Sequence, residues 1–214
     1  MMTLRTQKLI TLAVLSASMV TALSACAPMI IGSAVVGSMM VIDRRTAGTQ
    51  IEDEGIELRA ASALRTTLGD RVHVNITSFN RQVLVTGEAL TALDRQQIEQ
   101  VVGKVENVRS VVNEVAVMGH TSLSQRSSDV LVTSKVKAAL VDARDMSVNA
   151  FKVVTERGTT YLMGRVTKRE ADRATDIARG TGGVLKVVRM LEIISEDELR
   201  VLQPASTPAP KPVL

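Results

Sequence analysis

One side chain of this sequence has the setting of a nucleophile that becomes modified. Cys26 is the single cysteine of the chain, and it follows Leu23, Ser24 and Ala25. Small side chains before a cysteine fit the narrow cleft of a signal peptidase, and the thiol is the nucleophile that takes up diacylglycerol. We therefore predict lipidation at Cys26. Because a lone cysteine has no partner in the chain, an internal disulfide and a cysteine-cluster metal site are both excluded.

The residues before Cys26 have the order of an export signal. Arg5 and Lys8 form a basic start, and residues 9–23 are apolar and uncharged. This run is shorter than the roughly 20 residues that a membrane-spanning helix needs. The stretch that ends in Cys26 resembles a bacterial lipobox, so we predict a lipoprotein signal peptide over residues 1–25. The alternative is an ordinary signal peptide with a chance cysteine.

The segments at the two ends of the mature chain carry further expectations. In bacterial lipoproteins an Asp after the cysteine usually marks retention in the inner membrane, so Ala27 favours the outer membrane, facing the periplasm. Residues 27–42 are small and apolar, and either lie on the bilayer or pack on the first domain. Residues 204–214 contain four prolines, which block helix, so we predict a flexible Pro-rich tail over residues 195–214.

The body of the chain shows the same order of elements twice. Apolar spacing predicts a helix at 52–69, strands at 72–78 and 82–88, a helix at 91–104 and a strand at 108–117. The second copy has a helix at 129–141, strands at 147–154 and 159–166, a helix at 168–180 and a strand at 184–194. Gly87 and Gly164 are equivalent and lie 77 residues apart. The pattern predicts an α+β protein of two tandem small domains, each helix–strand–strand–helix–strand, with helices packed on a three-stranded sheet.

Particular residues in both copies resemble the BON domain. They are residues 83–88 (VLVTGE) and 108–115 in the first copy, and residues 155–158 (TERG), 161–167 (YLMGRVT) and 169–171 (REA) in the second. With the lipobox and the junction at residues 43–50, the arrangement resembles the dual BON-domain outer-membrane lipoproteins. The resulting organisation is a signal peptide at 1–25, a lipidated linker at 26–51, BON domains at 52–119 and 128–194, a linker at 120–127 and a tail at 195–214.

The two copies differ in charge. Residues 52–119 carry seven Lys/Arg and ten Asp/Glu, net −3, whereas residues 126–194 carry thirteen and eight, net +5. An anionic membrane surface attracts each nearby basic side chain by about 1 kcal/mol. The second copy can therefore approach anionic phospholipid, and the resemblance implies that the second BON domain is the lipid-binding one. The alternative is that the extra cations only solvate the surface.

The helix at 129–141 combines apolar and basic side chains and is the candidate contact. The candidate lipid-binding residues are Leu131, Lys135, Val136, Lys137 and Val141. An alternative places Val136 in the core and leaves only the lysines exposed.

An enzyme is not expected. Catalysis needs a nucleophile with a base, paired carboxylates or a metal cluster, whereas the only thiol is expected to be acylated and His73 and His120 lie in unrelated contexts. No catalytic or metal-binding residue is therefore predicted. No cofactor is predicted either, beyond covalent diacylglycerol and an N-acyl lipid on Cys26. Once Arg5 and Lys8 are removed, the net charge of +4 falls to about +2, too weak to indicate nucleic acid.

Together the sequence and the resemblance predict an outer-membrane lipoprotein that binds anionic phospholipid such as phosphatidylglycerol and supports membrane integrity and envelope stress tolerance. Two alternatives stay open. One is a protein-interaction adaptor that docks on an envelope or division-site assembly, and the other is a general periplasmic stress protein.

Overall fold

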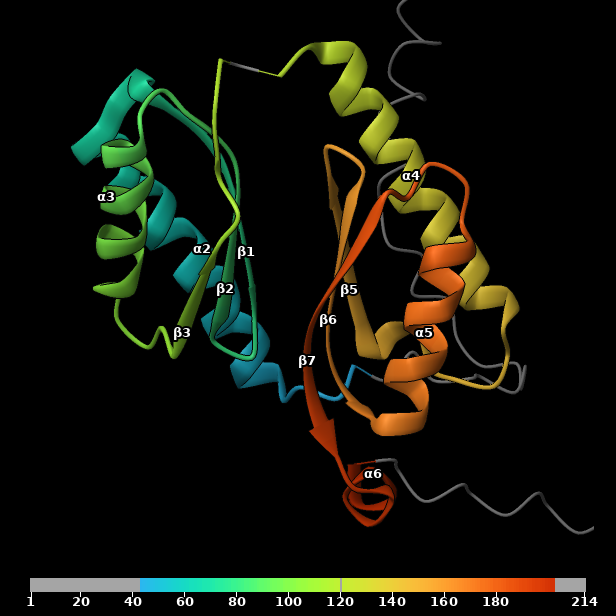
Figure 1. Ribbon diagram of the computed structural model, residues 1–214. Helices are drawn as coiled ribbons and strands as arrows, with labels where there is room; N and C mark the ends of the chain where they lie inside the picture. The colour runs from blue at the N-terminus through green and yellow to red at the C-terminus, as the bar shows by residue number, and fades with distance from the viewer. Residues whose placement is uncertain (1–42, 120, 203–214) are drawn as a thin grey trace, which may run out of the picture. The chain divides into compact units, whose positions relative to one another are not determined.

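The computed structural model describes residues 43–119 and 121–202. All of them belong to one compact unit, Met40–Leu214, which is distinct from Met1–Met39. Within this unit the chain builds the same set of helices and strands twice (Figure 1).

The first domain follows the predicted order, except that the predicted last strand at 108–117 is divided into two short strands, which gives this sheet four strands instead of three. It consists of α2 (Ala47–Leu68), β1 (Val72–Phe79), β2 (Gln82–Ala89), α3 (Ala92–Gly103), β3 (Ser110–Asn113) and β4 (Ala116–Val117). The strands β1 and β2 are antiparallel, while β3 and β4 both pair parallel to β2. The turn between β1 and β2 is Asn80-Arg81, with positive φ angles of 50° and 65°. Positive φ at both central residues matches the twist of a two-residue hairpin.

The second domain repeats this arrangement. It consists of α4 (Leu123–Asp142), β5 (Phe151–Glu156), β6 (Thr159–Thr167), α5 (Lys168–Gly180), β7 (Lys186–Ile194) and the short α6 (Glu196–Leu202). The sheet order is β5-β6-β7, antiparallel and then parallel. The predicted α+β fold with two tandem copies is therefore confirmed.

Three helices lie partly or wholly in segments predicted as linker or tail, and two of them begin early because a side chain caps the helix. Thr46 accepts a hydrogen bond from the Thr49 N–H and starts α2 inside the predicted 26–51 linker. Ser122 caps α4 in the same way, inside the predicted 120–127 linker. In the predicted flexible tail, α6 forms with Leu199 buried.

Each domain has its own core between its helices and its sheet. In α2 the core side chains are Ile56, Ala60, Leu64 and Leu68, and the equivalent residues of α4 are Val132, Val136 and Leu140. In α3 the core side chains are Ile98 and Val102, whereas Leu93 is 61% exposed. Its neighbour Asp94 is buried instead and pairs with Arg71 at 2.6 Å.

The glycines that defined the repeat have a common steric cause. A Cβ atom on Gly87, which has φ +116°, would lie 2.1 Å from the carbonyl oxygen of His73. A Cβ atom on Gly164 would lie 2.4 Å from the carbonyl oxygen of Ala150. In both hairpins the neighbouring backbone therefore approaches too closely for any side chain.

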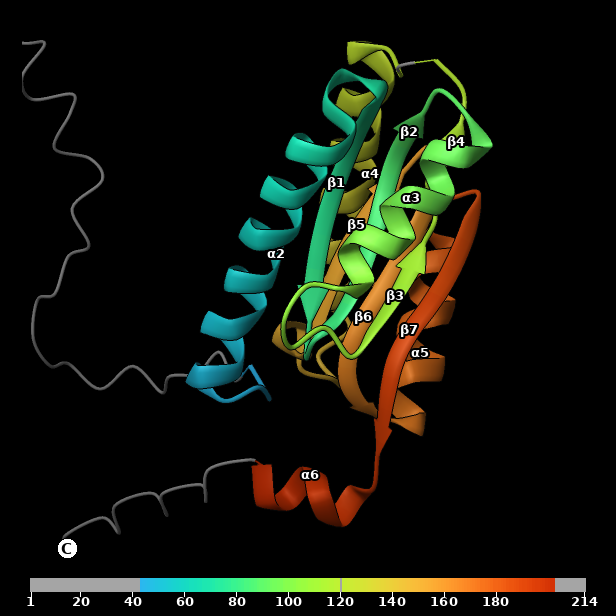
Figure 2. The ribbon, with the colours of Figure 1, turned by 90° about the vertical axis from the view of Figure 1, so that its left-hand side faces the viewer.

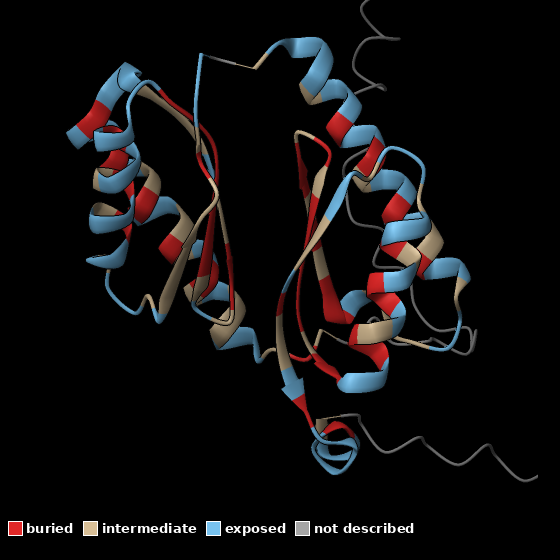
Figure 3. Ribbon diagram, in the orientation of Figure 1, coloured by how far each residue is buried: buried red, intermediate tan, exposed pale blue. Residues whose placement is uncertain are grey.

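The two sheets also pack on each other, so that the layers are helices, sheet, sheet and helices (Figures 1 and 2). A third core joins the domains, formed by Phe79, Leu84, Tyr161, Met163 and Met190. The central strands β2 and β6 are consequently buried on both faces over most of their length, where they are coloured red (Figure 3).

Polar contacts between the domains surround this third core. Lys152 pairs with Glu57 at 2.9 Å, and the Asn80 side chain donates to Glu192 at 2.6 Å. Burial and the nearby Glu114 carboxylate raise the pKa of Tyr161 to about 12. The phenol therefore stays protonated and can donate to Glu114.

The residues just before α2 bridge both domains. Arg44 donates two hydrogen bonds to Glu170 at 2.7 and 2.8 Å and a third to the Arg165 carbonyl at 2.9 Å. The side chains of Arg44 and Glu170 are each only 3% exposed. Arg45 instead pairs with Asp53 of the first domain. The chain thus contacts the second domain before it builds the first.

Candidate functional site

The helix α4 has one buried and one exposed face, and its residues divide clearly between them. Val132, Val136 and Leu140 enter the core of the second domain. The opposite face carries large hydrophobic side chains that are strongly exposed: Leu123 (79%), Val130 (66%), Leu131 (63%) and Val141 (57%). With 100° of rotation per residue, these four residues lie on one side of the helix. We call this set the outward stripe.

The predicted lipid contacts are only partly brought together. Leu131 and Val141 lie in the outward stripe, and Lys135 and Lys137 are exposed. Val136 is 0% exposed in the domain core, so its assignment as a lipid contact is wrong. Its apolar side chain fills the helix–sheet space, which was the alternative interpretation.

Three surface residues of α4 were missed, namely Leu123, Arg126 and Val130. They lie at or before residue 130, in a stretch that was predicted to be linker or the first residues of the helix. The available signal was Ser122, a favourable N-cap residue, whose side chain accepts from the Gln125 N–H. A helix begun there extends the stripe by almost two turns.

A buried aspartate on α4 fixes this helix to the hairpin beneath it. Asp129 accepts hydrogen bonds from the Arg157 and Gly158 N–H groups, both at 2.9 Å. The equivalent Asp53 of α2 accepts from the N–H groups of the first hairpin turn, at Asn80 and Arg81, both at 2.8 Å. Each copy therefore uses one carboxylate to hold its tight turn against its first helix.

The environment of Asp53 also changes its acidity. Burial acts to raise its pKa, but hydrogen bonds from the Arg81 N–H, the Ser78 hydroxyl and Arg45 outweigh burial and lower it below the ordinary value. The ionised form is therefore the one that the fold requires.

Asp129→Asn should lower the free energy of unfolding by about 1.5–3 kcal/mol, the range for hydrogen bonds to a charged group. Asparagine keeps one acceptor oxygen but replaces the other with an amide that faces a backbone N–H. Urea denaturation followed by circular dichroism measures the change. Asp142→Asn, an exposed site at the end of the same helix, should change stability by less than about 0.5 kcal/mol. Equal losses would show that Asp129 does not hold the turn.

The charge asymmetry between the copies has a structural component. Two cations of the second domain pair with acids of the first, Lys152 with Glu57 and Arg157 with Glu88. Part of the excess charge therefore stabilises the domain interface. On α4, by contrast, Arg126, Lys135 and Lys137 form no ion pair with the described residues.

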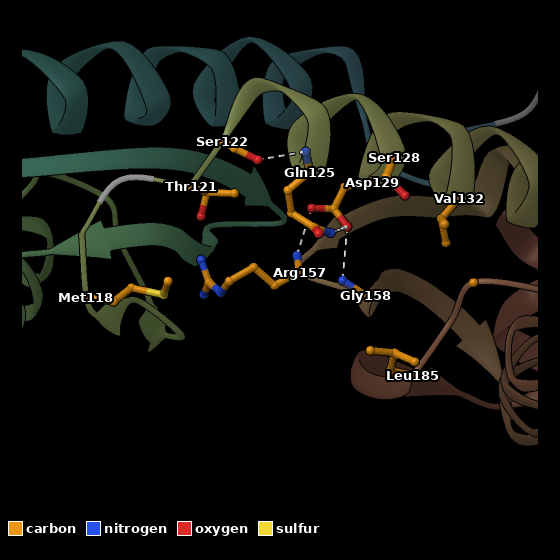
Figure 4. Close-up of a pocket in the computed structure, with 11 residues that line it drawn as sticks. Met118, Thr121, Ser122, Gln125, Ser128, Asp129, Val132, Arg157, Gly158 and Leu185 are labelled. Atoms are coloured by element: carbon orange, nitrogen blue, oxygen red, sulfur yellow. Dashed lines mark hydrogen bonds between the residues drawn. The ribbon is translucent and has the colours of Figure 1, made fainter.

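Two hollows border α4. The first lies between the N-terminal half of the helix, the interdomain segment and the β5–β6 turn, and is lined in part by Met118, Gln125, Arg157 and Leu185 (Figure 4). Its floor is polar, because Arg157 there donates to the Gly87 carbonyl and to Glu88. The second hollow lies between α4, β1 and β5 and has a volume of about 590 Å³.

Metal sites and membrane-spanning helices can be sought only in the residues that the structure describes. In residues 43–119 and 121–202, no group of three or more His, Cys, Asp or Glu side chains could hold a metal ion. No helix in the same ranges is long and apolar enough to cross a membrane. Cys26, the signal peptide, residues 27–42, His120 and the end of the tail from residue 203 lie outside the described residues.

Comparison with known proteins agrees with the repeated fold. The BON domain family matches residues 52–119 and 128–195. Outer membrane lipoprotein DolP of Haemophilus influenzae is 33% identical over 175 residues, which cover 80% of this chain and 90% of that protein. The 21 kDa hemolysin of Actinobacillus pleuropneumoniae is 30% identical over 155 residues, covering 72% and 80%.

Among solved structures, the C-terminal domain of CdsD, a structural protein of the Chlamydia trachomatis type III secretion system, covers 64% of this chain. Its TM-score of 0.28 and identity of 12% are too low to carry an argument. The family match and the two relatives do carry one. The chain belongs to the BON-domain family and is an outer-membrane lipoprotein with two BON domains.

Proposed function

We propose that this lipoprotein binds anionic phospholipid through the exposed face of α4 and thereby supports outer-membrane integrity and envelope stress tolerance. The observation that carries the proposal is the outward stripe, which leaves four large hydrophobic side chains 57–79% exposed on one helix. An exposed apolar stripe with cations at its borders is the surface that enters a lipid interface.

The energetics favour an interface over bulk water. Full burial of a Val or Leu side chain contributes about 1.5–3 kcal/mol, and each neighbouring cation adds about 1 kcal/mol. Two stripe residues and three cations therefore contribute about 6–9 kcal/mol in total. A free energy of this size corresponds to vesicle binding in the micromolar range. Arg126 and Lys137 border the stripe on one side and Lys135 on the other, as helical spacing requires.

The first domain provides a natural comparison. On α2, Ile51 and Leu58 are 71% and 72% exposed, which lies within the range of the stripe residues of α4. Their domain is acidic, however, and Glu54 lies exposed between them on the same helix. An anionic bilayer should repel this face despite its apolar side chains.

Val130→Glu combined with Leu131→Glu should weaken binding to anionic vesicles at least about tenfold, because apolar burial is lost and two negative charges are added. The test uses the chain from residue 43 to residue 214, which holds every described residue, in co-sedimentation with phosphatidylcholine vesicles with and without phosphatidylglycerol. Binding should require phosphatidylglycerol.

The matched control is Ile51→Glu with Leu58→Glu, which makes the same chemical change at equally exposed sites. This control should bind like wild type, and circular dichroism must show that both variants fold. If the two double variants lose binding equally, or neither does, α4 is not the lipid-binding surface.

A further inference from the structure

The second hollow beside α4 is a groove that the two domains form together. Its walls include Arg126, Thr133 and Lys137 of α4, residues 153–156 of β5, and His73 and Asn75 of β1 in the first domain. Val130 of the outward stripe lies on its rim, so the groove opens beside the apolar surface.

The two cations of the groove lie on the same side of α4. Lys137 follows Arg126 after about three helical turns, which returns it to nearly the same direction. Other cations of the second domain, such as Arg165 and Arg173, pair with acids. Within the described chain Arg126 and Lys137 do not, and so their charge is available to a ligand.

The two acids that line the groove are already bound. Asp129 is 5% exposed and accepts from two backbone N–H groups. Glu156 is 8% exposed and accepts from Arg157 and from the Asn75 amide. Beyond them, His73 lies 3.6 Å from Glu88, which pairs with Arg157. The charge that faces the opening is therefore that of Arg126 and Lys137.

We propose that this groove binds the phosphate of an anionic phospholipid, with Arg126 and Lys137 as its cationic contacts and the β1 edge as its opposite wall. The acyl region then lies along the neighbouring stripe at Val130 and Leu131. The inference rests on the proposed lipid-binding function, and it adds a defined headgroup subsite to which the first BON domain contributes.

The geometry makes the lysines of α4 unequal. Lys135 is two residues from Lys137, which rotates it by about 200° around the helix. Lys135 therefore does not face the groove. It can contribute only to the general electrostatic attraction between the protein and an anionic membrane. A site-specific headgroup contact and a diffuse electrostatic attraction can thus be separated by which cation is removed.

The test titrates the chain of residues 43–214 with dihexanoyl phosphatidylglycerol below its micelle concentration, followed by amide NMR. Arg126→Gln with Lys137→Gln should weaken this binding at least about tenfold. The matched control, Lys104→Gln with Lys186→Gln, removes two exposed cations that lie outside the groove and should bind within about twofold of wild type. In wild type the amide signals of His73 and Asn75 should shift together with that of Thr133.

A second titration identifies the source of the phosphate. Glycerol 3-phosphate alone should bind more weakly than the short-chain lipid, and equal affinity would overturn the assignment to a lipid in favour of a free phosphate site. If both double variants lose binding equally, or if no amide signal of the first domain shifts, the groove is not the headgroup site. In either case the vesicle co-sedimentation of the Val130→Glu, Leu131→Glu variant tests the proposed function independently of the groove. If wild type binds no phosphatidylglycerol in either form, the proposed function fails as well.

Discussion

Arg44→Ala is expected to lower the free energy of unfolding by about 3–5 kcal/mol. The substitution leaves the Glu170 carboxylate buried without its charged partner, and an uncompensated buried charge carries a penalty of this size. Glu170 is 2% exposed and holds the N-terminus of α5 through a capping box with Thr167. Urea denaturation followed by circular dichroism measures the loss.

A control in α2 separates the effect of this buried pair from the loss of an exposed arginine. Arg59→Ala removes a more exposed arginine, whose side chain is 43% exposed and pairs with Glu52, and should cost about 1 kcal/mol or less. The double variant Arg44→Met with Glu170→Met should be less destabilised than Arg44→Ala, because no buried charge is left unpaired. If Arg44→Ala lowers the free energy of unfolding no more than Arg59→Ala does, the Arg44–Glu170 pair does not hold the segment before α2 on the second domain.

The same pair makes stability depend on pH in a defined direction. Burial acts to raise the pKa of Glu170, but hydrogen bonds from Arg44 and from the Thr167 N–H outweigh it and lower the pKa. A lowered pKa in the folded state adds stability above the unfolded value of about 4.3. That contribution is lost as the pH falls through the folded pKa, so wild type and Arg44→Ala should converge in stability under acid.

Met163→Ala is expected to lower the free energy of unfolding by about 2–5 kcal/mol, the range for truncating a fully buried side chain. Met163 is 0% exposed and lies in the core between the two sheets, with Leu84 and Tyr161. Wild type should unfold in one transition, because this core joins the domains. Calorimetry should show that transition broaden or divide in the variant.

Met118→Ala makes the same chemical change where methionine is 45% exposed, and it should cost less than about 0.5 kcal/mol. Two separate transitions in wild type would contradict the coupling. A single domain expressed alone should expose its half of the shared core, including Phe79 or Met190, and is expected to aggregate.

The repeat was predictable because it rests on local patterns. Helical spacing from Ile56 to Leu68, the turns at Asn80 and Arg157, and the equivalent glycines all act within a few residues. The packing of one sheet on the other was not predicted. Leu84 and Met163 stand in short continuous apolar runs, which are compatible with strands buried on both faces. Such a run does not identify which distant element covers the second face of the strand.

The candidate site shows the same division. The exposure of Leu131 and Val141 follows from helical periodicity, once the buried side is fixed by Val132 and Leu140. Val136 lies four residues from each of them, so the same periodicity places it on the buried side, as the alternative interpretation had it. The contribution of β1 to the groove could not be inferred, since it depends on how the two domains meet.

The pairing of Arg44 with Glu170 also determines how the molecule bears load. Every covalent path from Cys26 to the folded body passes through Arg44 before it reaches α2. A pull applied at Cys26, the predicted lipidation site, is therefore expected to reach α5 through the bidentate ion pair before it reaches α2. Tension on the tether is resisted by two parallel hydrogen bonds to a helix N-terminus, so the first domain is shielded from unravelling at its own N-terminal helix.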